Sequence, residues 1–255
     1  MSDLSLSLRQ VRYTNKAFWR NPASAFFTFA FPLMFLVIFT ALFGGGRTTI
    51  GNQTFSTAKL YVPSIAAFSV ITACYTNIAI SVTFARDTGV LKRIHGTPLP
   101  GWAYVAARVM HAVIVACILV AIVAAFGRVF YDVIPPSGVT LVRFLVTLVV
   151  GAASFAALGL ALTCVIPNAD AAPAVVNATV LPLLFLSGVF IPVSNSTPAW
   201  INTVGNLFPI RHFVIAMNAA FLGTPFSWSD VAYVALWGIA GLLLAARYFI
   251  WEPRK

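Results

Sequence analysis

Charged residues are scarce in this chain, because Lys, Arg, Asp and Glu make up only 9% of its 255 residues. Soluble domains carry about 25% charged and about 45–50% apolar residues, whereas 60% of this chain is apolar in the set AVILMFWYC. The composition therefore excludes a soluble globular protein. It also excludes a disordered chain, because 22 Phe and 6 Trp cannot stay solvated. We expect one polytopic membrane domain over residues 1–255.

Acidic residues are the rarest charged class, with six in the chain, and all of them fall in loops or at the ends of apolar runs. A proton-coupled carrier normally keeps an ionisable carboxylate inside the membrane, so the pattern counts against an acidic proton relay. Sodium coupling through carbonyl and hydroxyl oxygens stays open. The phosphate-binding pattern GxxxxGK[ST] is missing, because no Gly precedes any lysine. Any nucleotide is therefore expected on another subunit.

Cysteine and histidine are also few. Cys74, Cys117 and Cys164 lie in apolar runs, without a CxxC pair and without His at ligand spacing. Three such thiols argue against a disulfide framework and against zinc, and we interpret them as small hydrophobic residues. The three histidines form no HExxH pair, and no GxSxG pattern is present. We expect no catalytic residue, no metal site and no cofactor held by this chain.

Long apolar runs dominate what is present. A membrane-spanning helix needs roughly 20 apolar residues at about 1.5 Å per residue. The sequence predicts an all-α fold with six such spans, at residues 24–43, 60–84, 102–126, 144–166, 172–193 and 231–251. Six spans put both termini on one side of the membrane.

The basic residues decide which side that is. Eleven of the 16 fall on the side of the termini, and the five on the other side are Arg47, Lys59, Arg128, Arg143 and Arg211. The positive-inside rule therefore predicts a multi-pass protein of the plasma or inner membrane with both termini in the cytoplasm. The net charge of +10 is thus a topology signal, and no nucleic acid is needed to explain it.

Residues 4–20 interleave apolar and basic residues at roughly helical spacing. This pattern predicts an amphipathic helix in the cytoplasmic interface, whose polar face meets anionic lipid or a cytoplasmic partner. The alternative is a basic flank that only sets topology. The residues expected to act at this interface are Arg9, Arg12, Lys16, Trp19 and Arg20.

Residues 85–97 form a cytoplasmic loop after the second span, and Pro98 and Pro100 follow it. A short helix there would carry charges on one side and Val90, Leu91 and Ile94 on another. Such a helix suits the docking of a soluble subunit. The spacing alone fits equally well a connector whose charges only set topology.

Residues 194–222 are uncharged except for Arg211, yet prolines interrupt them. The segment is too apolar for an extracellular loop and too interrupted for a span, so we predict short re-entrant helices in the outer leaflet. Arg211 and His212 are expected to face a water-filled path or to snorkel to the headgroups.

Few polar groups lie within the spans, and these are candidates for a substrate path. Tyr75, Asn77 and Asn177 come first, with polar packing between helices as the alternative. The complete candidate set is Tyr75, Asn77, Asn177, Phe185, Arg211 and His212.

Three stretches together resemble the membrane subunit of an ABC-2 type exporter, most of all the daunorubicin-resistance type of drug permease. Residues 18–46, FWRNPASAFFTFAFPLMFLVIFTALFGGG, resemble the Arg-x-Pro entry and Phe-Pro first span of that family. Residues 86–100, RDTGVLKRIHGTPLP, are similar to its cytoplasmic pattern, with Asp87 where Glu is commoner. Residues 185–221 resemble its late Ser-Gly-x-x-x-Pro and Pro-x-Trp signature, with Phe208 where Asn is usual and His212 where Tyr is commoner.

The resemblance implies a type V exporter architecture and a division of labour. A dimer of permeases, either two copies of this chain or this chain with a related one, would work with two copies of an ATP-binding cassette ATPase. ATP and Mg would be held by that ATPase, so this chain itself is not an enzyme. The expected coupling residues are Arg86, Asp87, Gly89, Leu91, Lys92, Arg93 and His95.

The resemblance also implies export of an amphipathic substrate, a drug or a lipid-like molecule, from the cytoplasm or the inner leaflet. Export of a lipid-linked glycan is an alternative within the family. Two alternatives belong to other classes: an ion-coupled carrier or channel that acts without an ATPase, and an assembly subunit that only binds partners.

Overall fold

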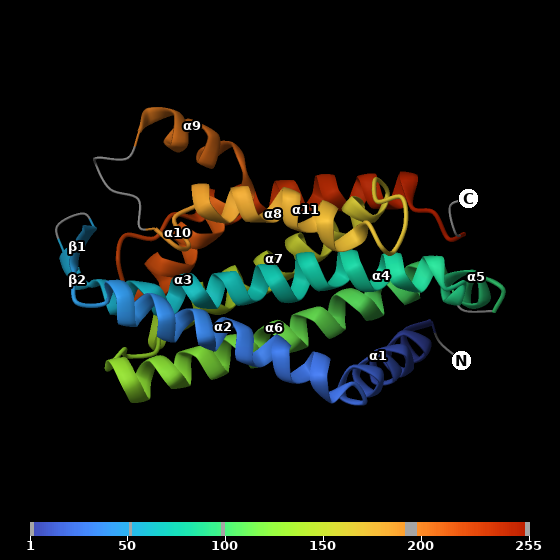
Figure 1. The fold of residues 1–255 in the computed structure, drawn as a ribbon, viewed down its shortest axis with the longest axis horizontal. Coiled ribbons are helices and arrows are strands. Elements are labelled where there is room, and N and C mark those ends of the chain that lie inside the picture. Colours follow the sequence, from blue (N-terminus) through green and yellow to red (C-terminus); the bar gives the residue numbers. More distant parts are fainter. Residues whose placement is uncertain (1–2, 51–52, 98–99, 192–197, 253–255) are drawn as a thin grey trace.

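The computed structural model describes residues 3–50, 53–97, 100–191 and 198–252. Its elements are, in chain order, α1 (Asp3–Trp19), α2 (Pro22–Phe43), β1 (Arg47–Ile50), β2 (Gln53–Ser56), α3 (Thr57–Ile71), the π-helical turn η1 (Thr72–Thr76), α4 (Asn77–Asp87), α5 (Val90–His95), α6 (Gly101–Tyr131), α7 (Gly138–Thr163), α8 (Ala172–Leu186), α9 (Ala199–Leu207), α10 (Pro209–Leu222) and α11 (Trp228–Tyr248). Figure 1 shows an elongated bundle with α1, α5 and both chain ends at one end, and with the β-hairpin and α9 at the other.

Five helical runs in the described part of the chain are long and apolar enough to cross a membrane. They cover residues 25–43, 57–87, 101–131, 138–163 and 228–248. Their number and hydropathy confirm the prediction of a helical, multi-pass membrane protein. The runs also extend past several predicted limits, as the helix Gly101–Tyr131 does around residues 102–126.

Within the expected fifth span over residues 172–193, the described residues 172–191 are helical only as α8, which has 15 residues. That length corresponds to about 22 Å, against a hydrocarbon core of about 30 Å. The helix ends at Leu186, and Gly188 then adopts a φ of 83°. Glycine takes this left-handed conformation at little cost, so the chain turns where the apolar pattern predicted a continuing helix. Figure 1 shows α8 lying along the bundle, from the end with α5 toward the end with α9.

A short β-hairpin joins α2 to α3, a feature that the hydropathy pattern did not predict. Strand β1 pairs antiparallel with β2, so that Arg47 lies opposite Ser56. The hairpin lies at the same end of the bundle as α9 (Figure 1).

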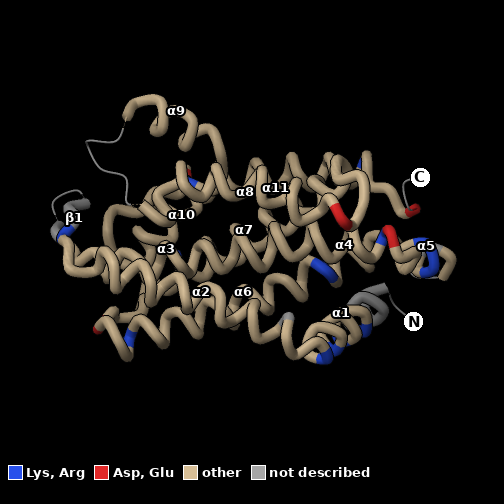
Figure 2. Tube along the Cα trace, in the orientation of Figure 1, with Lys and Arg blue, Asp and Glu red and all other residues tan. Residues whose placement is uncertain are grey.

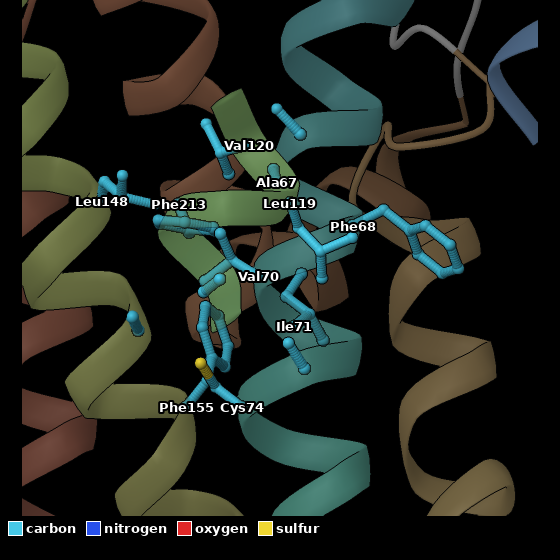
Figure 3. Packing of buried hydrophobic residues seen from close by; sticks show 14 of the residues in the cluster. Ala67, Phe68, Val70, Ile71, Cys74, Leu119, Val120, Leu148, Phe155 and Phe213 are labelled. Carbon is cyan, nitrogen blue, oxygen red and sulfur yellow. The ribbon is translucent and has the colours of Figure 1, made fainter. Parts of the chain in front are cut away.

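The core is built around α3 and α10. Val62, Ile65 and Val70 of α3 are completely buried, as is Phe213 of α10. The ring of Phe213 packs edge-on against Phe155 of α7, with 5.2 Å between the ring centres. Figure 3 shows both rings in the interior, close to α3. Helix α10 is therefore a buried packing element, whereas residues 194–197 of the predicted re-entrant segment lie outside the described residues.

Small residues allow α7 and α11 to approach closely over the most extensive helix–helix contact of the described chain. A Cβ atom added to Gly238 would lie 2.8 Å from the Cα atom of Ser154, and one added to Gly241 would lie 3.0 Å from the backbone N of Leu158. Close approach through small residues is typical of helix packing in membranes.

The run from Thr57 to Asp87 contains the π-helical turn η1 at Thr72–Thr76. Such turns often occur at functional sites because they shift the register of the side chains that follow. Helix α7 approaches here too: a Cβ atom added to Gly159 would lie 2.6 Å from the carbonyl oxygen of Tyr75.

Candidate functional site

The end of α4 is tied to the end of α7 by a buried arginine. The side chain of Arg86 is only 2% exposed. Its Nη1 donates to the carbonyl oxygen of Thr163 at 3.0 Å, and its Nη2 donates to those of Ile166 at 2.9 Å and Pro167 at 3.2 Å. The last carbonyls of a helix lack partners within that helix, so Arg86 caps α7 and holds α4 against it.

Asp87 takes part in the same junction. Its Oδ1 accepts a hydrogen bond from Nε of Arg86 at 3.2 Å, and its Oδ2 accepts one from the backbone N–H of Ala169. Arg86 and Asp87 were both expected to contact a cytoplasmic partner. Their side chains instead bind the turn between α7 and α8, so they position the neighbouring α5.

Helix α5 begins at a left-handed turn and has one buried anchor. Gly89, which precedes it, has a φ of 73°, a conformation that favours glycine. The side chain of Leu91 is completely buried, and Ile94 packs partly against the same core. These contacts determine which side of α5 faces away from the bundle.

The outward face of α5 is basic. Lys92 and Arg93 are exposed, and Nζ of Lys92 lies 3.3 Å from Oε1 of Glu252, which is exposed as well. Four of the seven expected coupling residues therefore hold α5 in place, namely Arg86, Asp87, Gly89 and Leu91. Two others, Lys92 and Arg93, face solvent. The side chain of His95 lies outside the described residues.

Helix α1 lies beside the same end of the bundle and packs mainly against α6. Trp19 is 51% exposed, and its ring stacks on Phe29 with 5.7 Å between the ring centres. The basic residues expected at the interface are all exposed, namely Arg9, Arg12, Lys16 and Arg20. Figure 2 shows that the basic residues gather at this end, on α1, on α5 and near the C-terminus.

Two cavities flank the run from α3 to α4. One, of about 390 Å³, lies between α1, α4, α5 and α6. The other, of about 420 Å³, lies between α2 and the run itself. Asn77 and Ser81 line both cavities, so this part of α4 forms the wall between them.

Thr72 and Thr76 add hydroxyl groups to the cavity beside α2. The Oγ1 atom of Thr76 is buried and has no hydrogen-bond partner among the described residues. These threonines and Ser81 were not among the predicted path residues. The sequence signal that could have found them is the cluster of polar residues, Thr72, Thr76, Asn77 and Ser81, within one otherwise apolar run.

The other candidate path residues lie apart from these cavities. The hydroxyl of Tyr75 pairs with Oγ1 of Thr179 on α8 at 3.0 Å, which is the polar packing considered as the alternative. Asn177 is exposed, and Phe185 is 56% exposed. These α8 side chains therefore face outward from a single copy of the chain.

Arg211 and His212 lie at the end of the bundle with α9, and both make contacts within the chain. Nη2 of Arg211 donates to Oδ1 of Asn202 at 2.8 Å, and the residue is only 9% exposed. Nδ1 of His212 lies 2.6 Å from Oδ1 of Asp230, and its Nε2 lies 3.0 Å from the carbonyl oxygen of Asn206. These contacts tie α9, α10 and α11 together, an arrangement that differs from both roles expected for the pair.

Comparisons with known proteins place most of the chain in one group. The family model described as "ABC-2 type transporter" matches residues 9–222. The chain is 27% identical over 223 residues to the "Inner membrane transport permease YadH" of Escherichia coli (strain K12), which covers 86% of this chain and 83% of that protein. It is 26% identical over 200 residues to the "Putative transport permease ycf38" of Cyanophora paradoxa, which covers 77% of this chain and 67% of that one.

A further similarity is to the "Probable multidrug ABC transporter permease YbhR" of Escherichia coli (strain K12). The identity is 28% over 176 residues, which cover 69% of this chain. The match spans about half the length of that relative, 46%.

Proposed function

This chain belongs to the ABC-2 type transporter family, and from that membership we propose that it is the permease subunit of an exporter driven by a separate ATP-binding cassette ATPase. The permease character is common to the relatives, and the apolar helices and the same relatives support a multi-pass protein of the inner membrane. We propose that both termini are cytoplasmic, that two permease chains pair, and that two ATPase copies bind ATP and Mg.

The basic face of α5 carries the proposal. This short helix carries two exposed cations, Lys92 and Arg93. It is held against the bundle by the buried side chain of Leu91 and by the hydrogen bonds of Arg86 at the end of the preceding helix. A coupling element needs a rigid attachment to the bundle, because a movement of the docked ATPase reaches the spans only through firm contacts between them. The junction joins the end of α4, which α5 follows directly, to the end of α7, so a push on α5 would move two spans together.

Charge reversal at Arg93 tests this docking. Arg93→Glu is expected to lower stimulation of the co-purified ATPase about tenfold or more, because like charges at an interface cost several kcal/mol and about 1.4 kcal/mol is tenfold. The measurement is ATP hydrolysis by the complex in proteoliposomes. Arg128→Glu is the matched control, since Arg128 is exposed near the opposite end of α6. Unchanged assembly and stimulation with Arg93→Glu would contradict the docking role.

We propose that the substrate path begins at the cavity beside α2. Its wall combines the hydroxyl and amide groups of Thr72, Thr76 and Asn77 with the rings of Phe27 and Phe31. A few polar groups within an apolar, aromatic wall suit an amphipathic molecule. A drug-like or lipid-like substrate that leaves the cytoplasm or the inner leaflet fits this wall.

Replacing the shared amide tests the path. Asn77→Leu is expected to lower substrate export about tenfold while ATPase stimulation by the folded complex remains, because the change removes from the cavity wall an amide that could hydrogen-bond to the substrate. ATP-driven uptake of an amphipathic fluorescent dye and of a lipid-linked glycan into inverted vesicles, which corresponds to export from the cell, would be measured in parallel. Asn177→Leu on the exposed face of α8 is the control. If Asn177→Leu blocks export and Asn77→Leu does not, the path follows α8 instead.

The positions of the acidic residues bear on the alternative of an ion-coupled carrier. Asp87, Asp132 and Asp230 lie at the ends of α4, α6 and α11, and Asp170 and Glu252 lie between or beyond helices. A carboxylate in the middle of a span, as a proton relay would use, is therefore lacking among the described residues. This arrangement favours an energy source outside the chain. Transport that persists after removal of the ATPase would overturn the proposal.

A further inference from the structure

The cavity between α1 and α6 contains a cation that the proposed transport does not use. Arg108 of α6 lies on its wall, and no Asp or Glu among the described residues lines it. Nε of Arg108 donates to the hydroxyl of Tyr104 at 3.0 Å, and the guanidinium carbon lies 5.3 Å from the centre of that ring. Tyr104 is itself only 1% exposed, so a rigid, buried side chain sets the direction of the guanidinium.

The terminal nitrogens Nη1 and Nη2 of Arg108 have no hydrogen-bond or carboxylate partner among the described residues. A partly buried cation without a counter-charge is costly, and chains normally pair it. The planar fork of a guanidinium fits the oxygens of a phosphate or carboxylate through two parallel hydrogen bonds. The two unpaired terminal nitrogens of Arg108 therefore indicate a site for an anionic ligand.

The remaining wall is part polar and part apolar. Gln10 and Thr14 of α1 contribute polar side chains, and His111 lies one helical turn after Arg108. Phe18 of α1 and Ile94 of α5 contribute apolar surface. A small inorganic anion would not use this apolar surface, whereas a ligand that joins an anionic group to hydrocarbon would use both parts.

The location and the size of the cavity narrow the choice further. It lies between α1 and α6, and these helices meet at the end of the bundle where Figure 2 shows the basic residues gathering. Basic amphipathic helices lie at the headgroup level of a bilayer and attract anionic lipids. A volume of about 390 Å³ accommodates a phosphate headgroup and the first acyl carbons of a lipid whose tails remain in the bilayer.

We propose that this cavity binds the headgroup phosphate of an anionic phospholipid of the inner leaflet, with Arg108 as its cationic contact. The bound lipid would lie between α1 and α6 and contact α5 through Ile94. It would thereby hold the interfacial helix in place beside the proposed coupling helix. This site goes beyond transport and does not depend on it, so its test needs neither an ATPase nor a substrate.

The test measures lipid binding to the purified full-length chain in detergent. Titration with phosphatidylglycerol, followed by native mass spectrometry, is expected to show one saturable lipid that binds more tightly than phosphatidylcholine. Arg108→Gln is expected to weaken this binding about tenfold, the effect of losing about 1.4 kcal/mol. Arg128→Gln on the same helix is the matched control and is expected to bind like the parent chain.

A second variant separates the effect of the guanidinium fork from that of charge alone, and a competition experiment separates a bound lipid from free phosphate. Arg108→Lys keeps the charge but loses the fork, so an affinity between those of the parent and of Arg108→Gln is expected. Equal affinity of a monodisperse Arg108→Gln chain and the parent would overturn the proposal. Displacement of the lipid by millimolar inorganic phosphate would assign the site to free phosphate and overturn the lipid assignment, whereas retention of the lipid would support it.

Discussion

Arg86→Ala is expected to destabilise the folded chain by about 3–5 kcal/mol, the range for removing one partner from a buried charged network. The substitution leaves the carbonyl oxygens of Thr163, Ile166 and Pro167 without their donor. It also leaves Asp87, whose side chain is 20% exposed, without its cation. Each buried acceptor left unpaired costs about 1–3 kcal/mol.

The measurement is thermal unfolding of the detergent-solubilised chain, followed by loss of its monodisperse peak in size-exclusion chromatography. Lys92→Ala is the matched control, because the ion pair of Lys92 with Glu252 is exposed on both sides and such pairs contribute about 0–1 kcal/mol. Arg86→Lys is expected to fall between the two, since a single ammonium cannot reach all three carbonyls in the same geometry. A shift for Arg86→Ala no larger than that for Lys92→Ala would refute the capping role.

The same junction separates stability from docking. Arg86→Ala is expected to reduce ATPase stimulation together with thermal stability, because its buried side chain holds α4 against the end of α7 and does not contact a partner directly. Arg93→Glu is expected to reduce stimulation without changing thermal stability, because its side chain is exposed. The two variants therefore distinguish loss of the structural attachment of α5 from loss of the surface that docks the ATPase.

The sequence predicted most of the helical architecture because hydropathy is a local property. Runs such as 138–163 and 228–248 are apolar enough to be found without any knowledge of their neighbours in the fold. The length of α8 could not be predicted from hydropathy, because the helix ends before Gly188, which has a φ of 83°, while the apolar run continues beyond it. The π-helical turn at Thr72–Thr76 has no composition of its own either.

The direction of charged side chains escaped prediction for a different reason. Arg86 and Arg93 are equally basic in the sequence, yet one binds the end of α7 and the other is exposed. Arg211 was expected to face water or the headgroups, and it pairs with Asn202 of α9 instead. For both buried arginines the deciding partner is a carbonyl or amide oxygen on another segment, and a single sequence does not show which segments meet.

Gly238→Leu is expected to abolish the monodisperse folded chain, or to destabilise it by more than the usual cost of overpacking, about 1–3 kcal/mol. An added Cβ atom would meet the side chain of Ser154 and lie 2.8 Å from its Cα atom. Backbone cannot rotate away as a side chain can, so α7 and α11 would have to separate. Their separation would open the most extensive helix–helix contact of the described chain.

Three further variants locate the cause in this close approach of the two helices. Gly45→Leu is the matched control, because a Cβ atom there has nothing within 4 Å, and it is expected to elute and unfold like the parent chain. Gly238→Ala is expected to be milder than Gly238→Leu. Adding Ser154→Gly to Gly238→Ala removes the side-chain part of the clash and leaves the clash with the backbone of α7, so partial recovery of thermal stability is expected. Equal tolerance of leucine at positions 45 and 238 would show that α7 and α11 pack more loosely than the distance between their backbones implies.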